Sequence, residues 1–187
     1  MPGALVAALG AVAAAALYVA TTEEPLPPKP DIPLEAWVPY GTLDDALPDI
    51  GRRGGSMREV SPFWFTAVGV DEIAVDPNAG AEATGAFIEA LRRTGADVVP
   101  SIVDLLPAGE MAAIIADPDT RTRHVEAIRR FAAVGDSDGI DIDYVQFAFA
   151  DGRETLATTR PNWVAFIEEL GAGLRTDGRS LVVSIPP

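Results

Sequence analysis

Short runs of β-branched and aromatic residues alternate with helix-like patterns from Leu34 onward. Such alternation is typical of βα units, whose strands lie parallel in one sheet. Five runs are predicted as strands, at residues 35–40, 60–67, 97–103, 139–145 and 180–185. The pattern therefore predicts a parallel α/β sheet of about five strands.

Helical spacing of apolar residues predicts three crossover helices between these strands. The first two cover residues 82–94 and 120–134 and end at glycines, and the third begins at Pro161 and fades near Gly178. Their apolar faces carry Phe87, Ile88 and Leu91, then Val125, Ile128 and Phe131, then Trp163, Phe166, Ile167 and Leu170. The first crossover, at residues 43–50, is expected to be short and broken by Pro48.

The spacing of the strands fits both a (β/α)₈ TIM-type barrel and an open doubly wound sheet. A complete barrel takes about 250 residues, whereas residues 34–187 hold 154. A barrel would thus be incomplete, with about five βα units and exposed sheet edges at its first and fifth strands. No glycine-rich phosphate loop follows the first strand, so a dinucleotide-binding open sheet has no support there.

The amino terminus differs from the rest of the chain. Residues 4–20 form an uncharged run of small and apolar side chains, so residues 1–22 are predicted to be a signal peptide or a membrane anchor. A buried helix of the folded domain is the alternative for this run. Residues 23–33 contain five prolines and are expected to form a stiff linker. The chain is therefore expected to be secreted or extracytoplasmic, with the segment either cleaved as a signal or retained as an anchor.

Charge and composition exclude several functions. The formal net charge of −14 would repel a nucleic-acid backbone. The chain has no cysteine and only one histidine, His124, which is expected on a solvated helix surface; no transition-metal site and no cofactor are predicted. The sequence around Asp136 and Asp138 does not complete a calcium-binding loop.

The chemically most informative stretch is Asp138-Gly139-Ile140-Asp141-Ile142-Asp143-Tyr144-Val145-Gln146. Alternation along a strand places Ile140, Ile142 and Tyr144 on one face and Asp141, Asp143 and Val145 on the other. Two neighbouring carboxylates on a buried strand cost free energy, because each loses hydration and they repel each other. We therefore interpret Asp141 and Asp143 as a functional pair at the mouth of a barrel.

Residues 138–144 resemble the signature of family 18 glycoside hydrolases, the chitinase-like enzymes, which reads Asp-Gly-apolar-Asp-apolar-Asp-aromatic-Glu. Seven of its eight positions match. The runs 147–152 and 160–163 are similar to a bacterial branch with chitin- and cell-wall-directed members. The resemblance implies that residues 34–187 form the amino-terminal part of such a barrel.

The same resemblance implies substrate-assisted cleavage of β-linked N-acetylglucosamine in chitin or peptidoglycan. Asp143 would orient the acetamido group of the sugar, and Asp141 would hold Asp143 and tune its charge. The eighth position, where the family has its proton-donating glutamate, is Val145. Hydrolysis is therefore expected to be weak or lost. The third strand departs as well, because Ser101-Ile102-Val103-Asp104 replaces the usual Ser-x-Gly-Gly.

Aromatic residues near the predicted strand ends are candidates for stacking on sugar rings. They are Trp37, Tyr40, Trp64 and Tyr144. Core packing is the competing interpretation for each of them.

Three other functions remain open at this stage. A lectin-like domain would keep the groove without the acid. A truncated remnant would neither bind a glycan nor melt cooperatively. A haloacid dehalogenase-like phosphatase is the third, because 141–145 also fits an Asp-x-Asp-x-Val start, although that motif closes the first strand of its domain.

Overall fold

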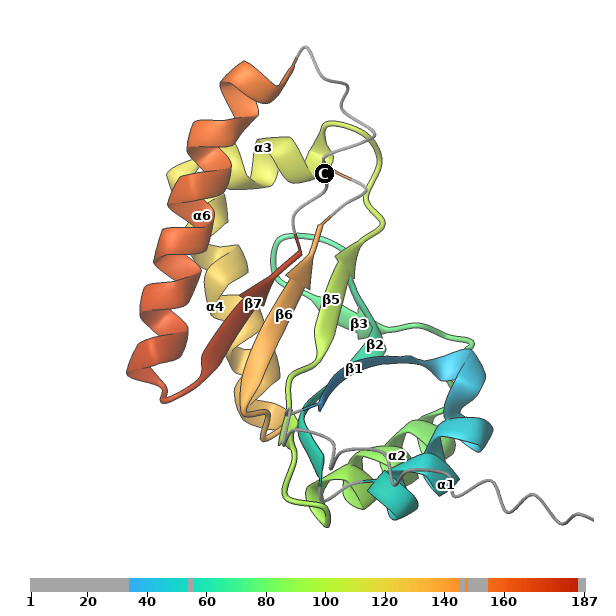
Figure 1. The fold of residues 1–187 in the computed structure, drawn as a ribbon. Helices are drawn as coiled ribbons and strands as arrows, with labels where there is room; N and C mark the ends of the chain where they lie inside the picture. Colours follow the sequence, from blue (N-terminus) through green and yellow to red (C-terminus); the bar gives the residue numbers. More distant parts are fainter. Residues whose placement is uncertain (1–33, 54–55, 145–146, 148–154, 185–187) are drawn as a thin grey trace, which may run out of the picture. The chain divides into compact units, whose positions relative to one another are not determined.

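The computed structural model describes residues 34–53, 56–144, 147 and 155–184 (Figure 1). These residues form a sheet with helices between its strands. In chain order the elements are β1 (Leu34–Pro39), the 3₁₀ turn η1 (Tyr40–Thr42), α1 (Leu43–Arg53), β2 (Met57–Ala67), β3 (Ile73–Val75), α2 (Ala81–Arg92), β4 (Asp97–Val98), β5 (Ser101–Asp104), α3 (Glu110–Ala116), α4 (Pro118–Val134), β6 (Gly139–Asp143), α6 (Leu156–Thr176) and β7 (Ser180–Val183).

The five predicted strands are present and parallel, in the order β1-β2-β5-β6-β7. The predicted third strand is divided into β4 and β5, both of which pair with β2. Proline has no N–H to donate, and Pro100 lies at this division. Backbone hydrogen bonds still join this segment to both neighbouring strands. Val99 N–H donates to Val60 O of β2 at 3.0 Å, and Asp141 N–H of β6 donates to Pro100 O at 2.9 Å.

Two helix groups pack on the same face of the sheet. α3, α4 and α6 lie together beside β5 to β7, and α1 and α2 lie together beside β1 and β2 (Figure 1). The first group buries a core around Ile102, Ile128, Ile142 and Phe166. The second group buries Val60, Trp64, Phe87 and Leu91.

Two elements were not predicted from the sequence. β3 is a three-residue strand that runs antiparallel to the end of β2, too short for an alternating pattern to show. α3 is a seven-residue, alanine-rich helix with buried Met111 and Ile115. Neither interrupts the order of the parallel strands.

The two proline positions were misjudged. α1 continues through Pro48 to Arg53, and Pro48 is exposed, where water can bind the carbonyl that it leaves free. α6 begins at Leu156, so that Pro161 lies inside the helix rather than at its start. α4 agrees better with its prediction: the Asp117 side chain accepts from Thr120 N–H at 2.9 Å and caps the helix, with Pro118 in the first turn.

The prediction for His124 was wrong. Its ring is completely buried between α4 and the aromatic residues of α6, stacked on Phe166. One ring nitrogen lies 2.9 Å from Val70 O and the other 2.8 Å from the Tyr144 hydroxyl, which means Nδ1 donates and Nε2 accepts in the neutral ring. Helical spacing alone did not show that this position faces the core.

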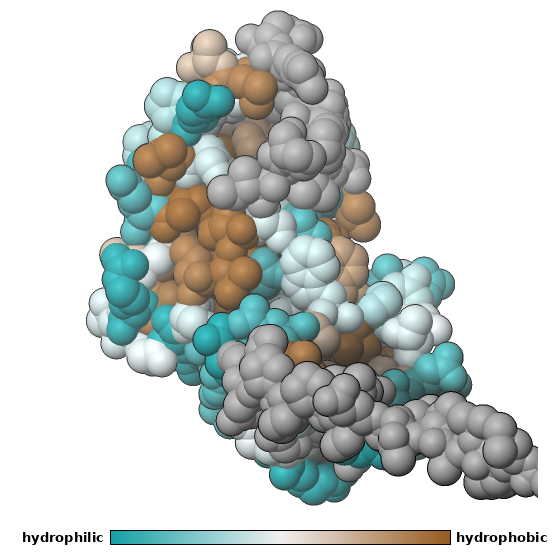
Figure 2. All heavy atoms as spheres, viewed as in Figure 1, coloured by the Kyte–Doolittle hydropathy of each residue, from teal (hydrophilic) through white to brown (hydrophobic). Residues whose placement is uncertain are grey.

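The sheet is open at both ends within the described residues. β1 pairs only with β2, and β7 only with β6, as predicted. Figure 2 shows a hydrophobic area over β7 and the adjoining part of α6. In β7, Leu181, Val182 and Val183 are half-buried. Apolar side chains beside an unpaired strand edge are suited to further packing.

No helix within the described ranges is long and apolar enough to cross a membrane. The predicted signal or anchor (1–22) and the linker (23–33) lie outside those ranges. Both remain predictions.

His124 gives the fold a testable pH dependence. Burial lowers the pKa of His124 below 6.5, although Asp71 and the Val70 carbonyl oppose this. The His124 ring is therefore protonated at a higher pH in the unfolded chain than in the folded chain. As a result, the free energy of unfolding falls as pH drops from about 6.5 towards the folded pKa. In chemical denaturation at several pH values, His124→Gln is expected to remove a slope of up to about 1.4 kcal/mol per pH unit. No other histidine is present to mask the effect, and equal slopes in both proteins would contradict this assignment.

Candidate functional site

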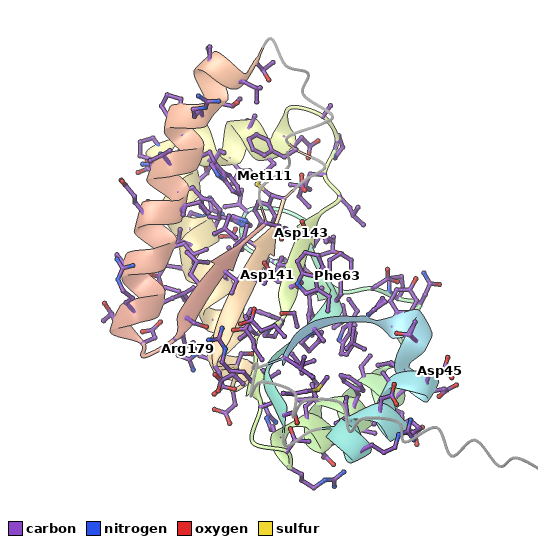
Figure 3. All side chains as sticks on the ribbon, viewed as in Figure 1. Asp45, Phe63, Met111, Asp141, Asp143 and Arg179 are labelled. Atoms are coloured by element: carbon purple, nitrogen blue, oxygen red, sulfur yellow. The ribbon has the colours of Figure 1, made fainter. Side chains whose placement is uncertain are left out.

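β6 separates its side chains as the sequence predicts. Ile140, Ile142 and the adjacent Tyr144 enter the helix-packed core, and Asp141 and Asp143 lie on the opposite face. We call this opposite side the inner face of the sheet. In Figure 3, Asp141, Asp143 and Phe63 gather where β6, β5 and β2 run side by side.

Asp141 is a buried carboxylate with one satisfied oxygen. Ser101 Oγ donates to its Oδ2 at 2.6 Å across the β5–β6 ladder, and the whole residue is 0% exposed. Oδ1 has no hydrogen-bond partner of normal geometry among the described residues. Burial raises the pKa of Asp141, and Ser101 and the nearby Trp37 side chain oppose that rise.

Asp143 lies one pleat nearer the carboxyl end of the strand. It is 8% exposed, and burial followed by the charge of Asp141 raises its pKa. The predicted contact in which Asp141 holds Asp143 is therefore electrostatic here, since the hydrogen bond of Asp141 goes to Ser101. In both residues the protein therefore favours the neutral carboxyl more than water does.

Asp143 borders a cavity of about 550 Å³ at the carboxyl ends of the parallel strands. The lining comes from β1 and η1, β2, β5 and β6, with Asp76 following β3: Pro39, Tyr40, Gly41, Phe63, Trp64, Phe65, Thr66, Asp76, Val103, Asp104, Leu105 and Asp143. This is the end of the strands at which βα barrels place their sites. The size suits a small ligand such as one or two sugar rings.

Two of the four predicted aromatic contacts are accessible to a ligand. Tyr40 is half-buried and lines the cavity. Trp37 is 58% exposed, with its ring 6.4 Å from that of Phe63 and its side chain close to Asp141. An exposed indole beside carboxylates can hold the CH face of a sugar while the acids bind its polar groups.

The other two aromatic residues belong mainly to the core. Trp64 touches the cavity but is only 4% exposed, and its ring packs edge-on against Phe87. A register shift in β2 between Phe63 and Phe65 directs this part of the strand towards the helices.

Tyr144 requires a correction. It is 2% exposed, does not line the cavity, and donates its hydroxyl hydrogen to His124 in a cluster with Phe166 and Trp163. Its position after Asp143 in the alternation explains why it faces the helices. We therefore assign Tyr144 to the core and not to a ligand contact.

Sequence reasoning did not foresee the part played by Asp104. This residue is 1% exposed at the end of β5, borders the cavity, and accepts from Phe147 N–H at 2.6 Å. Asp104 thus ties the end of β5 to the chain that follows β6. A lone acid at a strand end gave no signal for that contact. Val145, the predicted acid position, lies outside the described residues.

Within the part of the chain that the structure describes, no three acidic or histidine side chains are placed to hold a metal ion. The phosphatase interpretation required the Asp-x-Asp motif on the first strand of the domain. The structure places it on β6, the fourth parallel strand along the chain.

A scan against protein-family models and a search of curated proteins found no match to the sequence. Solved structures do match. A class V chitinase from Pseudomonas fluorescens aligns with a TM-score of 0.67 at 17% identity, over 82% of this chain and 44% of that one. A spore cortex-lytic enzyme from Bacillus cereus aligns at 0.63 and 14%, over 81% and 34%. A family 18 chitinase from Cycas revoluta in complex with (GlcNAc)₃ aligns at 0.58 and 20%, over 81% and 45%.

These alignments show the fold. The described residues form part of the (β/α) barrel found in family 18 chitinases, with a sheet that is not closed. The chain spans less than half the length of these structures.

The buried charge of Asp141 makes a stability prediction. Since its pKa is raised in the folded state, ionisation destabilises the fold as pH rises from 3.8 through the folded pKa. Asp141→Asn keeps the shape and an acceptor for Ser101, and is expected to increase the free energy of unfolding at neutral pH by at least about 1 kcal/mol. The gain should disappear below about pH 3.8. The exposed Glu168→Gln is the control, and a destabilised Asp141→Asn protein at pH 7 would contradict the account.

Proposed function

We propose that this domain is of family 18 lineage and binds glycans containing β-linked N-acetylglucosamine, such as fragments of chitin or peptidoglycan. The observation that carries the proposal is the buried pair Asp141 and Asp143 on the inner face of a chitinase-type sheet, with Asp143 in the cavity at the strand ends. The Cycas revoluta structure contains (GlcNAc)₃ and the Bacillus cereus protein is a cortex-lytic enzyme, which supports both glycan classes.

The acidic and the aromatic side chains of the site have different roles in binding the sugar. Asp143 accepts a hydrogen bond from the acetamido N–H of the sugar and polarises that group. Asp141, fixed by Ser101, keeps a second negative charge behind Asp143 and so raises its pKa. Tyr40 and Trp37 provide apolar surface for the sugar rings.

Binding without efficient hydrolysis follows from the residue at position 145. In the substrate-assisted reaction the acetamido oxygen attacks the anomeric carbon, and a protein acid must protonate the leaving oxygen. Valine holds no such proton. A lectin-like role is therefore the second candidate, favoured by the exposed indole of Trp37.

The proposal includes export. The apolar run 4–20 would carry the domain to the extracytoplasmic side, where chitin and peptidoglycan occur, as a signal peptide or an anchor.

Binding can be tested by calorimetric titration with chitooligosaccharides. Trp37→Ala is expected to weaken binding by about 2- to 12-fold, because stacking on one aromatic ring contributes about 0.5–1.5 kcal/mol. Val134→Ala removes apolar surface at a position 89% exposed at the end of α4 and should leave affinity unchanged. No binding by a protein that melts cooperatively would refute the proposal, and the absence of a cooperative melt would favour a remnant.

Hydrolysis is tested at position 145. The unmodified chain should release no sugar from chitooligosaccharides above background, and Val145→Glu should increase release by about 10²-fold or more if the acid reaches the glycosidic oxygen. Val145→Gln is the matched variant, since an amide cannot donate the proton. Turnover by the unmodified chain equal to that of Val145→Glu would show that the acid at this position is not needed.

A further inference from the structure

His124 joins two segments that border the cavity, although its own ring lies in the core on the helix side of the sheet. Nε2 accepts from the Tyr144 hydroxyl at 2.8 Å, and Nδ1–H donates to Val70 O at 2.9 Å. Tyr144 directly follows Asp143, the acid that borders the cavity. Val70 belongs to the loop that joins β2 to β3. One side chain of α4 therefore contacts both the end of β6 and the β2–β3 loop.

The β2–β3 loop is a short connection that leads to the cavity lining. Inside it, Val68 N–H donates to Glu72 O at 3.2 Å, and β3 then pairs with the end of β2. Asp76 follows β3 directly and lines the cavity, and its N–H donates to Trp64 O at 2.8 Å. A displacement of the loop would thus reach the cavity through β3.

α4 holds this loop at two consecutive residues, of which His124 is the more important. Arg123 forms an ion pair with Asp71, but both side chains are more than half exposed, and a pair in water contributes little to stability. His124 is 0% exposed, so water cannot replace its two hydrogen bonds. The position of the loop therefore depends mainly on the bond from His124 to Val70 O.

A proton on His124 would disrupt one of these two bonds. The imidazolium ring carries a hydrogen on both nitrogens, so Nε2 can no longer accept from the Tyr144 hydroxyl. The new charge would also be buried among aromatic rings, since His124 is stacked on Phe166 and lies against Tyr144. Proton uptake therefore favours displacement of Tyr144, and with it of the end of β6.

The groups that face the His124 ring differ in their effect. From the loop, Asp71 favours the protonated ring, whereas α6 presents the apolar ring of Phe166. Burial, and then the charge of Asp104, raise the pKa of the Tyr144 hydroxyl, so that it stays a donor. For His124 itself burial has the largest effect and lowers its pKa below 6.5. The folded protein therefore holds the neutral ring at neutral pH.

We propose that His124 is a positioning residue for the glycan site: its neutral ring holds the end of β6 and the β2–β3 loop at the spacing that the bound sugar requires. The inference rests on the proposed function and adds a regulation of the same site. Proton uptake by the ring releases the Tyr144 bond and weakens glycan binding. His124 acts through Asp143 and Asp76 and does not touch the ligand.

The coupling is directly measurable because His124 is the only histidine of the chain. Its ring titration can be followed by NMR in the free protein and in the presence of saturating (GlcNAc)₃. If the neutral ring favours binding, the bound sugar must in return disfavour the protonated ring. We expect the titration midpoint to fall by about 0.5 pH unit, which corresponds to about threefold weaker binding by the protonated form.

Two substitutions at position 124 separate positioning from general stability. In calorimetric titration with (GlcNAc)₃ at pH 7.5, His124→Leu should weaken binding by about tenfold, because both bonds are lost. His124→Gln should restore most of the affinity, since its amide can donate to Val70 O and accept from Tyr144. Between pH 7.5 and 5, His124→Gln should also lose the threefold decrease and keep only the pH dependence that is due to Asp143.

Leu174→Val is the matched control. Leu174 is 0% exposed in the same core, near the end of α6 that leads to the start of β7, and so away from the cavity. The substitution lowers stability without touching His124, and the pH profile of binding should stay that of the unmodified protein. If His124→Leu does not fold, the NMR titration and His124→Gln decide the question.

The outcomes separate this inference from the function on which it rests. If (GlcNAc)₃ binds but the His124 midpoint is the same in the free and the bound protein, the inference is overturned and glycan binding stands. A ring that stays neutral until the protein unfolds, or a threefold decrease that is lost in Leu174→Val as well, would overturn it too. Absence of binding by the unmodified protein would remove both the inference and the proposed function.

Discussion

The period-two alternation of β6 is the constraint on which the rest of the site depends. A parallel strand between two others can be buried on both faces. In β6 one face packs isoleucines against α4 and α6, and the other bears Asp141 and Asp143. A shift of one residue would turn the two carboxylates towards α4 and α6 and move the isoleucines to the inner face, so the apolar packing fixes the direction of the acids. The free energy gained on the helix side offsets the cost of the buried charges.

Much of this arrangement could be predicted because it depends on local sequence. The strands, their parallel direction and the face occupied by Asp141 follow from apolar periodicity and from the lengths of the connections. The roles of Tyr144 and His124 could not be predicted, because they depend on a contact between α4 and the end of β6, 20 residues apart along the chain. Asp104 is a similar case, since its partner Phe147 comes from another βα unit. The split of the third strand, in contrast, has a visible cause in Pro100.

The open sheet also decides how the acidic residues of the inner face are solvated. A closed barrel would bury Glu35, Glu59 and Asp97 close together, which is costly without cations. In the open sheet Glu35 and Asp97 are exposed and Glu59 is half-buried, so solvent reaches them. The strands thus carry a sugar-sized cavity at their carboxyl ends and these three acidic residues nearer their amino ends.

The central claim is that Asp143 receives the acetamido group of a sugar from the inner face. A crystal structure of the domain with (GlcNAc)₃ tests it most directly. The account predicts a sugar in the cavity bordered by Tyr40 and Asp143, with an acetamido nitrogen within about 3 Å of the Asp143 carboxylate. A sugar seated on the helix side of the sheet, or one in the cavity whose acetamido group points away from Asp143, would contradict it.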